Sequence, residues 1–279
     1  MELQGAMSEP PVELTERVPG ARARLEQGHR ALRLRLARLR RPAWLGAFAR
    51  DFGFTTAVVV VYFVLRGIAP ERIDFAVRFG AGLMHAEKAL GLWWEPSIQA
   101  WTIRGRVVME FANFVYAYLH FPALIGVGVW LWFADRPAFR RVRNALFLSM
   151  PIGLLCYYLF PAAPPRLLPL YGYEVAIRDT VFGPGTVVSY DQPWFFKNDW
   201  AAIPSFHYGW MQLVTMAMWA YSRNPWVRAG GVFLLVAMTW SILATGNHFV
   251  LDAVAGGLVI WATWVAAGRW ERPRTRPTP

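Results

Sequence analysis

Apolar residues gather in six long runs that hold almost no charged side chains. The runs are 52–65, 107–133, 144–163, 201–222, 229–247 and 253–268. A helix needs about 20 apolar residues to cross the hydrocarbon core of a bilayer. The first run is short, and it extends past Arg66 if that side chain's stem lies in the bilayer while its charge reaches the headgroups. The pattern predicts an all-α, polytopic membrane helix bundle of about six transmembrane helices.

The segment between the first two runs, 68–106, mixes apolar and charged residues. It carries Trp93, Trp94 and Trp101, and tryptophan is enriched where a bilayer meets water. We therefore expect an interfacial helical segment here, lateral or re-entrant, rather than a further span.

Both ends of the chain are polar. Residues 1–50 are rich in arginine, and we expect a partly disordered cytoplasmic tail that touches anionic lipid headgroups, with binding of a specific partner as the alternative. Residues 51–270 form the predicted membrane-embedded catalytic helix bundle, and 271–279 form a second cytoplasmic tail.

The formal net charge is +11, and Lys88 and Lys197 are the only lysines. The arginines cluster between and outside the apolar runs, so membrane orientation explains the charge, and no nucleic-acid partner is expected. The arginine-rich N-terminal tail and segment 135–144 then face the cytoplasm. Segment 164–200 lies on the other side, as does 68–106 despite its basic residues. We expect an integral protein of a bacterial plasma membrane whose active site faces the extracytoplasmic side.

Three polar strings lie at the outer ends of successive predicted spans. They read PAAPPR at 161–166, PSFH at 204–207 and GNHFVLD at 246–252. Ionisable residues beside a bilayer usually mark function. His248 and Asp252 are four residues apart, which places them on one face of a helix. The carboxylate can fix one imidazole nitrogen, so that the other acts as a nucleophile or base.

His207 lies in the first turn of the fourth predicted span. Free N–H groups at a helix N-terminus bind phosphate oxygens, and a histidine there can protonate a leaving oxygen. An arginine adds a bidentate phosphate contact. The predicted phosphate-binding residues are Arg166, Ser205, Lys197, Gly246 and Asn247.

A metal site is the sharpest alternative use of these side chains. His207, His248 and Asp252 match a facial triad of two histidines and one carboxylate. Ser205 and Arg166 would then have no role, and Cys156, the only cysteine, lies alone in an apolar run. We expect neither a metal nor another cofactor.

The chain resembles the type-2 phosphatidic acid phosphatase superfamily of integral membrane lipid phosphatases. The resemblance covers roughly residues 107–267 and rests on the paired PSxH and HxxxD strings. It implies that His248 is the nucleophile that forms a phosphohistidine, that Asp252 orients it, and that His207 protonates the leaving alcohol. Water or another hydroxyl then takes the phosphate.

Four positions depart from the pattern of that superfamily. Leu159 stands where a lysine is usual, Leu167 follows Arg166 in place of proline, Phe206 replaces a glycine, and Ile242 replaces an arginine. The chain is similar in this to the divergent branch that includes the inositol phosphorylceramide synthases. The resemblance then implies transfer of phosphate to a polyol or lipid alcohol as well as hydrolysis.

Polar residues also interrupt the second predicted span. Asn113, Tyr116 and His120 are three and four residues apart and should share one helix face. They are candidates for binding a headgroup or an acceptor alcohol, and hydrogen bonding between helices is the alternative.

The expected substrate is a lipid phosphate or diphosphate drawn from the bilayer, with a polyol or lipid alcohol as the candidate acceptor. Two other functions stay open. The missing cations and the fifteen tryptophans suit a prenyl-diphosphate cyclase on the same scaffold. A noncatalytic lipid-binding or transport protein is the second, although the intact set of His207, His248 and Asp252 argues against it.

Overall fold

The computed structural model describes residues 42–183 and 197–270. Within these ranges the chain forms helices and no strand; its only β-type pairing is one isolated bridge between Ala162 and Ala201. The all-α prediction is confirmed. The chain divides into two units, 1–51 and 52–279, and the arrangement below concerns the second. The predicted tails lie outside the described residues except for 42–50, most of which begin helix α2.

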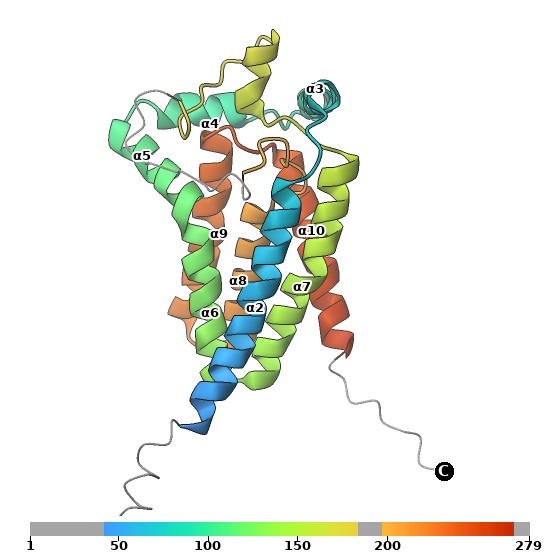
Figure 1. Ribbon diagram of the computed structural model, residues 1–279. Coiled ribbons are helices and arrows are strands. Elements are labelled where there is room, and N and C mark those ends of the chain that lie inside the picture. The colour runs from blue at the N-terminus through green and yellow to red at the C-terminus, as the bar shows by residue number, and fades with distance from the viewer. Residues whose placement is uncertain (1–41, 184–196, 271–279) are drawn as a thin grey trace, which may run out of the picture. The chain divides into compact units, whose positions relative to one another are not determined.

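The second unit is built around a bundle of upright helices (Figure 1). Five stretches are long and apolar enough to cross a membrane: Trp44–Gly67, Arg106–Ala134, Arg136–Leu159, Pro225–Ala244 and Val250–Arg269. The first stretch is α2 (Ala43–Gly67), and the last three are α7 (Arg136–Leu159), α9 (Pro225–Ala244) and α10 (Val250–Trp270). The second stretch is composite: α5 (Arg106–Phe114) is continued by the π-helical turn η1 (Val115–Leu119) and by α6 (His120–Ala134). Large apolar side chains such as Phe233, Leu258 and Trp261 are exposed, as expected for a surface in contact with lipid. The protein is an integral membrane protein.

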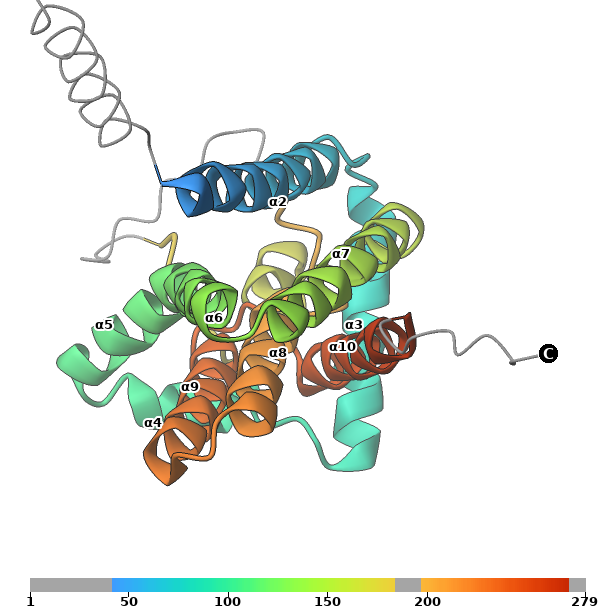
Figure 2. The same cartoon turned by 90° about the horizontal axis from the view of Figure 1, so that it is seen from below.

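The fourth predicted span is shorter than the apolar run indicates. Helix α8 (Phe206–Tyr221) has 16 residues, because 201–205 is not helical and Ala162 donates its N–H to the Trp200 carbonyl. Figure 2 shows α8 in the middle of the bundle, where it packs against α6, α7, α9 and α10. A short helix is tolerated there because protein, not lipid, surrounds its ends.

Segment 135–144, which separates the second and third apolar runs, is mostly the start of α7 and not a loop. Asp135 caps this helix by accepting a hydrogen bond from the N–H of Ala138 at 2.9 Å, and Pro137 suits the first turn. The guanidinium of Arg136 lies 3.2 Å from the ring centroid of Trp132. The arginines of this segment therefore lie on a helix, at the end of the bundle opposite the polar strings.

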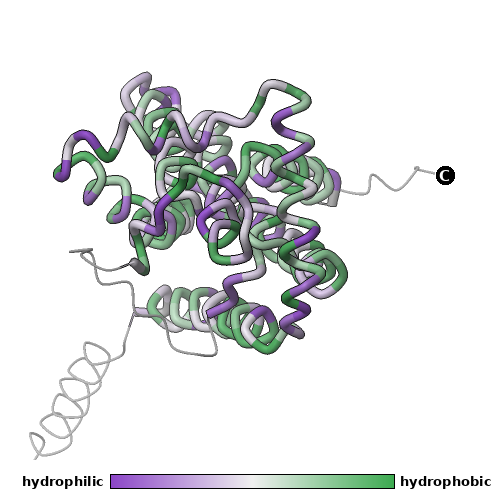
Figure 3. Tube along the Cα trace, turned by 90° about the horizontal axis from the view of Figure 1, so that it is seen from above, coloured by the Kyte–Doolittle hydropathy of each residue, from purple (hydrophilic) through white to green (hydrophobic). Residues whose placement is uncertain are grey.

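Two shorter helices cross the other end of the bundle, α3 (Ile73–Leu90) and α4 (Glu95–Thr102) (Figure 1). Gly91, with φ of 70°, ends α3, and a left-handed residue there favours glycine. The 3₁₀ turn η2 (Pro165–Tyr171) packs on α3. Viewed from this end, hydrophobic positions predominate on the upright helices and hydrophilic ones gather among the crossing segments (Figure 3). The interfacial helical segment predicted at 68–106 is thus a pair of lateral helices.

A close approach between α10 and the start of α8 sets the distance between the two histidine strings. A Cβ at Gly256 would collide with the backbone carbonyl of Ser205, and one at Gly209 would press on Gly256 and Ile260. The N–H of Ser205 donates to the carbonyl of Asp252 at 2.9 Å. Glycine at 256 therefore brings His207 within reach of His248.

Candidate active site

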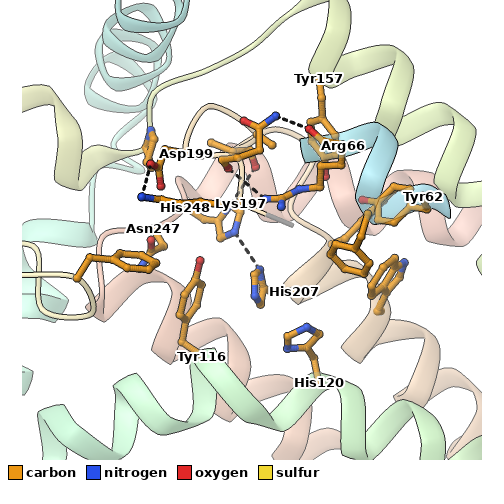
Figure 4. Close-up of a pocket in the computed structure, with 18 of the residues that line it drawn as sticks. Tyr62, Arg66, Tyr116, His120, Tyr157, Lys197, Asp199, His207, Asn247 and His248 are labelled. Carbon is orange, nitrogen blue, oxygen red and sulfur yellow. Dashed lines mark hydrogen bonds and ion pairs between the residues drawn. The ribbon is translucent and has the colours of Figure 1, made fainter. Parts of the chain in front are cut away.

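A cavity of about 80 Å³ opens at the end of the bundle that α3 and α4 cross. A single buried water needs roughly 10–15 Å³ of such space, so the cavity has room for a group of the size of phosphate. Arg166, His207 and His248 all line it. The structure thus brings together residues from three strings that lie far apart in the sequence (Figure 4).

The two histidines are in direct contact. Nε2 of His248 lies 3.3 Å from Nδ1 of His207, and Nδ1 of His248 lies 2.9 Å from the carbonyl oxygen of Ala202. A carbonyl only accepts hydrogen bonds, so Nδ1 of His248 carries the proton and Nε2 keeps its lone pair. His207 then donates from Nδ1 to this lone pair. The arrangement presents a nucleophilic nitrogen and a proton donor side by side.

Asp252 is fully buried behind His248. Its Oδ2 lies 3.4 Å from Nδ1 of His248 and accepts the N–H of Phe249 at 2.9 Å. The carboxylate therefore faces the nitrogen that the Ala202 carbonyl already holds, at a longer distance. The Ala202 carbonyl oxygen and Oδ2 of Asp252 both favour the tautomer of His248 with its proton on Nδ1. Asp252 also adds negative charge next to the ring.

Arg166 is buried and has a partner for each nitrogen of its guanidinium. Nε donates to Asn247 at 2.7 Å, one terminal nitrogen to Asp179 at 2.7 Å, and the other to Asp199 at 3.1 Å. Asn247, a predicted phosphate-binding residue, thus orients Arg166 and also lines the cavity. The two aspartates lie outside the motifs and were not among the predicted site residues.

Two further cations line the cavity, Lys197 and Arg66. Lys197 was a predicted candidate; its Nζ lies 3.3 Å from Asp199, which therefore bridges Lys197 and Arg166. Arg66 was interpreted only as the end of the first span. Its guanidinium donates to the carbonyl of Asn198 at 3.2 Å, and the Asn198 amide donates back to the Arg66 carbonyl at 2.7 Å. Lys197 and Arg66 thus add positive charge to the cavity, whereas Leu159 and Ile242 occupy the two positions at which the resemblance implies a cation.

Two predicted phosphate-binding residues do not line the cavity. Ser205 caps α8, where its hydroxyl accepts the N–H of Tyr208 at 3.4 Å. Gly246, with φ of 64°, accepts the N–H of Arg166 on its carbonyl at 2.9 Å. A side chain at 246 would collide with Ile177. Ser205 shapes the site by capping α8, and Gly246 does so through its backbone; direct phosphate binding by them stays a prediction.

The second span separates its three polar residues. Tyr116 and His120 line the cavity and pack on His207, with ring centroids 4.4 and 4.6 Å away. Figure 4 shows His207 between His248 and these two rings. Asn113 faces away and exchanges hydrogen bonds with Thr180, whose carbonyl accepts its amide at 2.7 Å. The π-helical turn from Val115 widens the helix between them, and such turns are frequent at functional sites.

Aromatic rings form the wall of the cavity next to α2 and α8. Phe206, which replaces the usual glycine, stacks on Trp210 with centroids 5.3 Å apart. Tyr62 contacts both rings at 6.2 and 5.7 Å. The wall also includes Phe63, Phe121 and Tyr157. An apolar group of a substrate can pack against these rings while its phosphate meets the cations.

Within residues 42–183 and 197–270, no group of three His, Cys, Asp or Glu side chains is arranged to hold a metal ion. The facial triad considered from the sequence therefore has no geometric counterpart there. His207 and Asp252 approach His248 from opposite sides of its ring, through different nitrogens.

The family model described as the PAP2 superfamily matches residues 81–266, more than half of the chain. The match includes the three strings and the lateral helix α4, while Arg66 lies outside it. No curated protein and no solved structure matches the chain.

Proposed function

The chain belongs to the PAP2 superfamily, and from that premise we propose that it cleaves or transfers a phosphate group of a lipid phosphate or diphosphate through a phosphohistidine at His248. Membership supports a membrane phosphatase or phosphotransferase in general. One observation carries the finer proposal: Nδ1 of His248 is held by the Ala202 carbonyl at 2.9 Å, and Nε2 faces His207 in a cavity lined by cations.

In the first step the lone pair of His248 Nε2 attacks phosphorus. The N–P bond forms while the bond from phosphorus to the lipid oxygen breaks. His207 enters this step as the imidazolium, which the charge of a bound phosphate favours, and it becomes neutral when it gives its Nδ1 proton to that oxygen. A phosphoryl group that binds between the two rings has to part them from their 3.3 Å contact. Arg66, Arg166 and Lys197 stabilise the charge on the remaining phosphate oxygens.

In the second step a hydroxyl oxygen attacks phosphorus of the phosphohistidine. The N–P bond breaks, its electron pair returns to Nε2, and His207, now neutral, takes the proton of the attacking hydroxyl. Water as the attacking group gives free phosphate, and an alcohol gives a new phosphate ester. Both routes return His207 and His248 to their starting protonation.

Two carboxylates beside Arg166 support transfer to a polyol. Asp179 and Asp199 are partly exposed, at 25% and 31% of their side chains, and carboxylates accept hydrogen bonds from hydroxyl groups. An acceptor with several hydroxyls can bind them next to the phosphate. This supports placing the chain in a branch similar to the inositol phosphorylceramide synthases, with the cavity at the extracytoplasmic end of the bundle.

The test follows phosphorus from a labelled lipid phosphate with the purified protein in detergent, with and without inositol as the polyol. His248→Ala runs alongside, with His85→Ala, an exposed histidine on α3, as the matched control. Free phosphate that depends on His248 supports hydrolysis, and label in the polyol supports transfer. Full turnover by His248→Ala sinks the mechanism. Lipid binding without movement of label favours a noncatalytic lipid-binding or transport protein.

The aromatic wall favours one second candidate, a prenyl-diphosphate cyclase. Faces of Trp and Tyr rings stabilise cations, and Tyr62, Phe206 and Trp210 line the cavity next to His207. A carbocyclic product from a prenyl diphosphate, with release of diphosphate, would support this function in place of phosphate transfer.

A further inference from the structure

Two carboxyl side chains from the lateral helices are fully buried at the start of α10. Glu87 of α3 accepts the N–H of Leu251 at 2.7 Å, and Glu95 of α4 accepts the N–H of Val250 at 2.9 Å. Asp252 accepts the N–H of Phe249 in the same way. Three successive N–H groups, immediately after His248, are therefore each held by a carboxyl oxygen.

The two glutamates also act on each other. The second oxygen of each is buried and has no hydrogen-bond partner in the described part of the chain, and each carboxyl group shifts the pKa of the other. We infer that one proton lies between the two carboxyl groups, because two buried carboxylates side by side repel each other. Burial, and then the neighbouring charge of Glu95, raise the pKa of Glu87 to about 9; burial likewise raises the pKa of Glu95. Glu87 thus carries the proton at neutral pH.

No lysine or arginine in the described residues neutralises the two glutamates in place of that proton. Neither Glu87 nor Glu95 forms an ion pair with a lysine or arginine among residues 42–183 and 197–270, and the other charged group that faces them is Asp252 on α10. The N–H groups at this helix end are also occupied by protein, so substrate phosphate is bound by the cationic side chains of the cavity. The pair consequently acts on the position of α10, not on the substrate.

We propose that Glu87 and Glu95 are positioning residues, a hydrogen-bonded pair that holds the first turn of α10 so that His248 keeps Nδ1 on the Ala202 carbonyl and Nε2 toward the cavity. The effect of the pair on catalysis rests on the proposed function of His248. The pair also gives the lateral helices a role, because α3 and α4 each supply one of its two glutamates.

Ionisation of Glu87 breaks this arrangement. Above pH 9 three carboxylates face one another at the start of α10, and the first turn is pushed away from Ala202. The folded pKa of Glu87 lies above its value of 4.5 in an unfolded chain, so the folded protein holds the extra proton. Stability therefore falls as pH rises through this range, up to about 9. Glu87→Gln keeps an acceptor for Leu251 and a donor for Glu95, and it does not titrate.

The experiment uses the full chain in detergent with ¹⁵N-labelled histidine rings, and the His248 signal is assigned with His248→Ala. Wild type and Glu87→Gln should show the proton on Nδ1 at pH 7, whereas Glu87→Met should show both tautomers. Turnover of lipid phosphate by Glu87→Met should have a kcat about a hundredfold lower with little change in KM. Above pH 9, wild type should change toward the Glu87→Met spectrum, and Glu87→Gln should not. Glu71→Gln, an exposed carboxyl that precedes α3, is the control.

A wild-type His248 spectrum in Glu87→Met overturns the proposal. If Glu87→Met does not fold, Glu87→Gln provides the test. A change of its His248 spectrum at the same pH as in wild type also overturns the proposal. Absence of any phosphate turnover by wild type refutes the proposed function instead, while the ring spectra still report whether the pair positions His248.

Discussion

The backbone carbonyl of Ala202 lies closer to Nδ1 of His248 than the carboxylate of Asp252 does, at 2.9 Å against 3.4 Å. The tautomer of His248 thus has two supports. The nearer one belongs to the non-helical segment before α8 and does not involve the Asp252 side chain.

Asp252→Asn should therefore lower kcat without abolishing turnover. The Ala202 carbonyl still holds Nδ1, while the negative charge that stabilises the cationic ring is lost; we expect a decrease on the order of a hundredfold. His248→Ala should leave no measurable turnover. Initial rates with labelled lipid phosphate compare the two, and equal loss in both variants would show that the backbone contact does not support the ring.

The proton donor should matter in proportion to the basicity of the leaving group. His207→Ala removes the donor, so release of a lipid alcohol should slow about a hundredfold or more, whereas release of p-nitrophenol needs little protonation. The measurement compares kcat for both kinds of substrate in His207→Ala and wild type. Equal losses would assign His207 to binding rather than proton transfer.

The membrane spans could be predicted from the sequence because a bilayer requires long apolar helices, and that requirement is visible in the hydropathy of each segment. The late start of α8 could not, because it depends on contacts of Ala162 and Trp200 across the fold. The π-helical turn at 115–119 likewise has no signal in its residues. It separates Asn113 from Tyr116 and His120, which an α-helical spacing would keep together.

The reacting groups of the candidate site could be predicted because the residue types and spacing of the PSxH and HxxxD strings reflect their chemistry. The prediction that His248 and Asp252 share one helix face was wrong in detail, because His248 lies two residues before α10 (Val250–Trp270), although its Nδ1 still lies 3.4 Å from Asp252. The cations could be predicted only in part. Arg66 reaches the cavity through a contact with Asn198, 132 positions away along the chain, and the end of an apolar run carries no sign of it. The same holds for Glu87 and Glu95, which are ordinary surface residues in the sequence and become buried only where α3 and α4 meet α10.

Arg66 should contribute to phosphate binding. Arg66→Met removes one charge from the cavity, and loss of a charge-assisted contact should raise KM about tenfold or more, with a smaller change in kcat. Arg104→Met is the control, because Arg104 is exposed and does not line the cavity. Unchanged KM in Arg66→Met would restrict phosphate binding to Arg166 and Lys197.

Gly256 should be required for stability as well as for the site. In Gly256→Ala the added methyl group meets the Ser205 carbonyl, and overpacking of this kind lowers the free energy of unfolding by about 1–3 kcal/mol. Gly126→Ala on α6 has open space around it and should be neutral. Thermal unfolding in detergent compares the two. A neutral Gly256→Ala would mean that α8 and α10 can move apart without cost.

Asp199 should compete with phosphate for the cations. Its carboxylate bridges Arg166 at 3.1 Å and Lys197 at 3.3 Å, so substrate phosphate has to displace it. In Asp199→Asn both cations keep a neutral neighbour, and inorganic phosphate should inhibit roughly threefold to tenfold more strongly. Glu174→Gln, an exposed acid that follows η2, should leave inhibition unchanged. If Asp199 instead binds the hydroxyls of an acceptor, phosphate should inhibit Asp199→Asn as it inhibits wild type, and the variant should lose transfer to the polyol. The two measurements together therefore distinguish a carboxylate that competes for the cations from one that binds the acceptor.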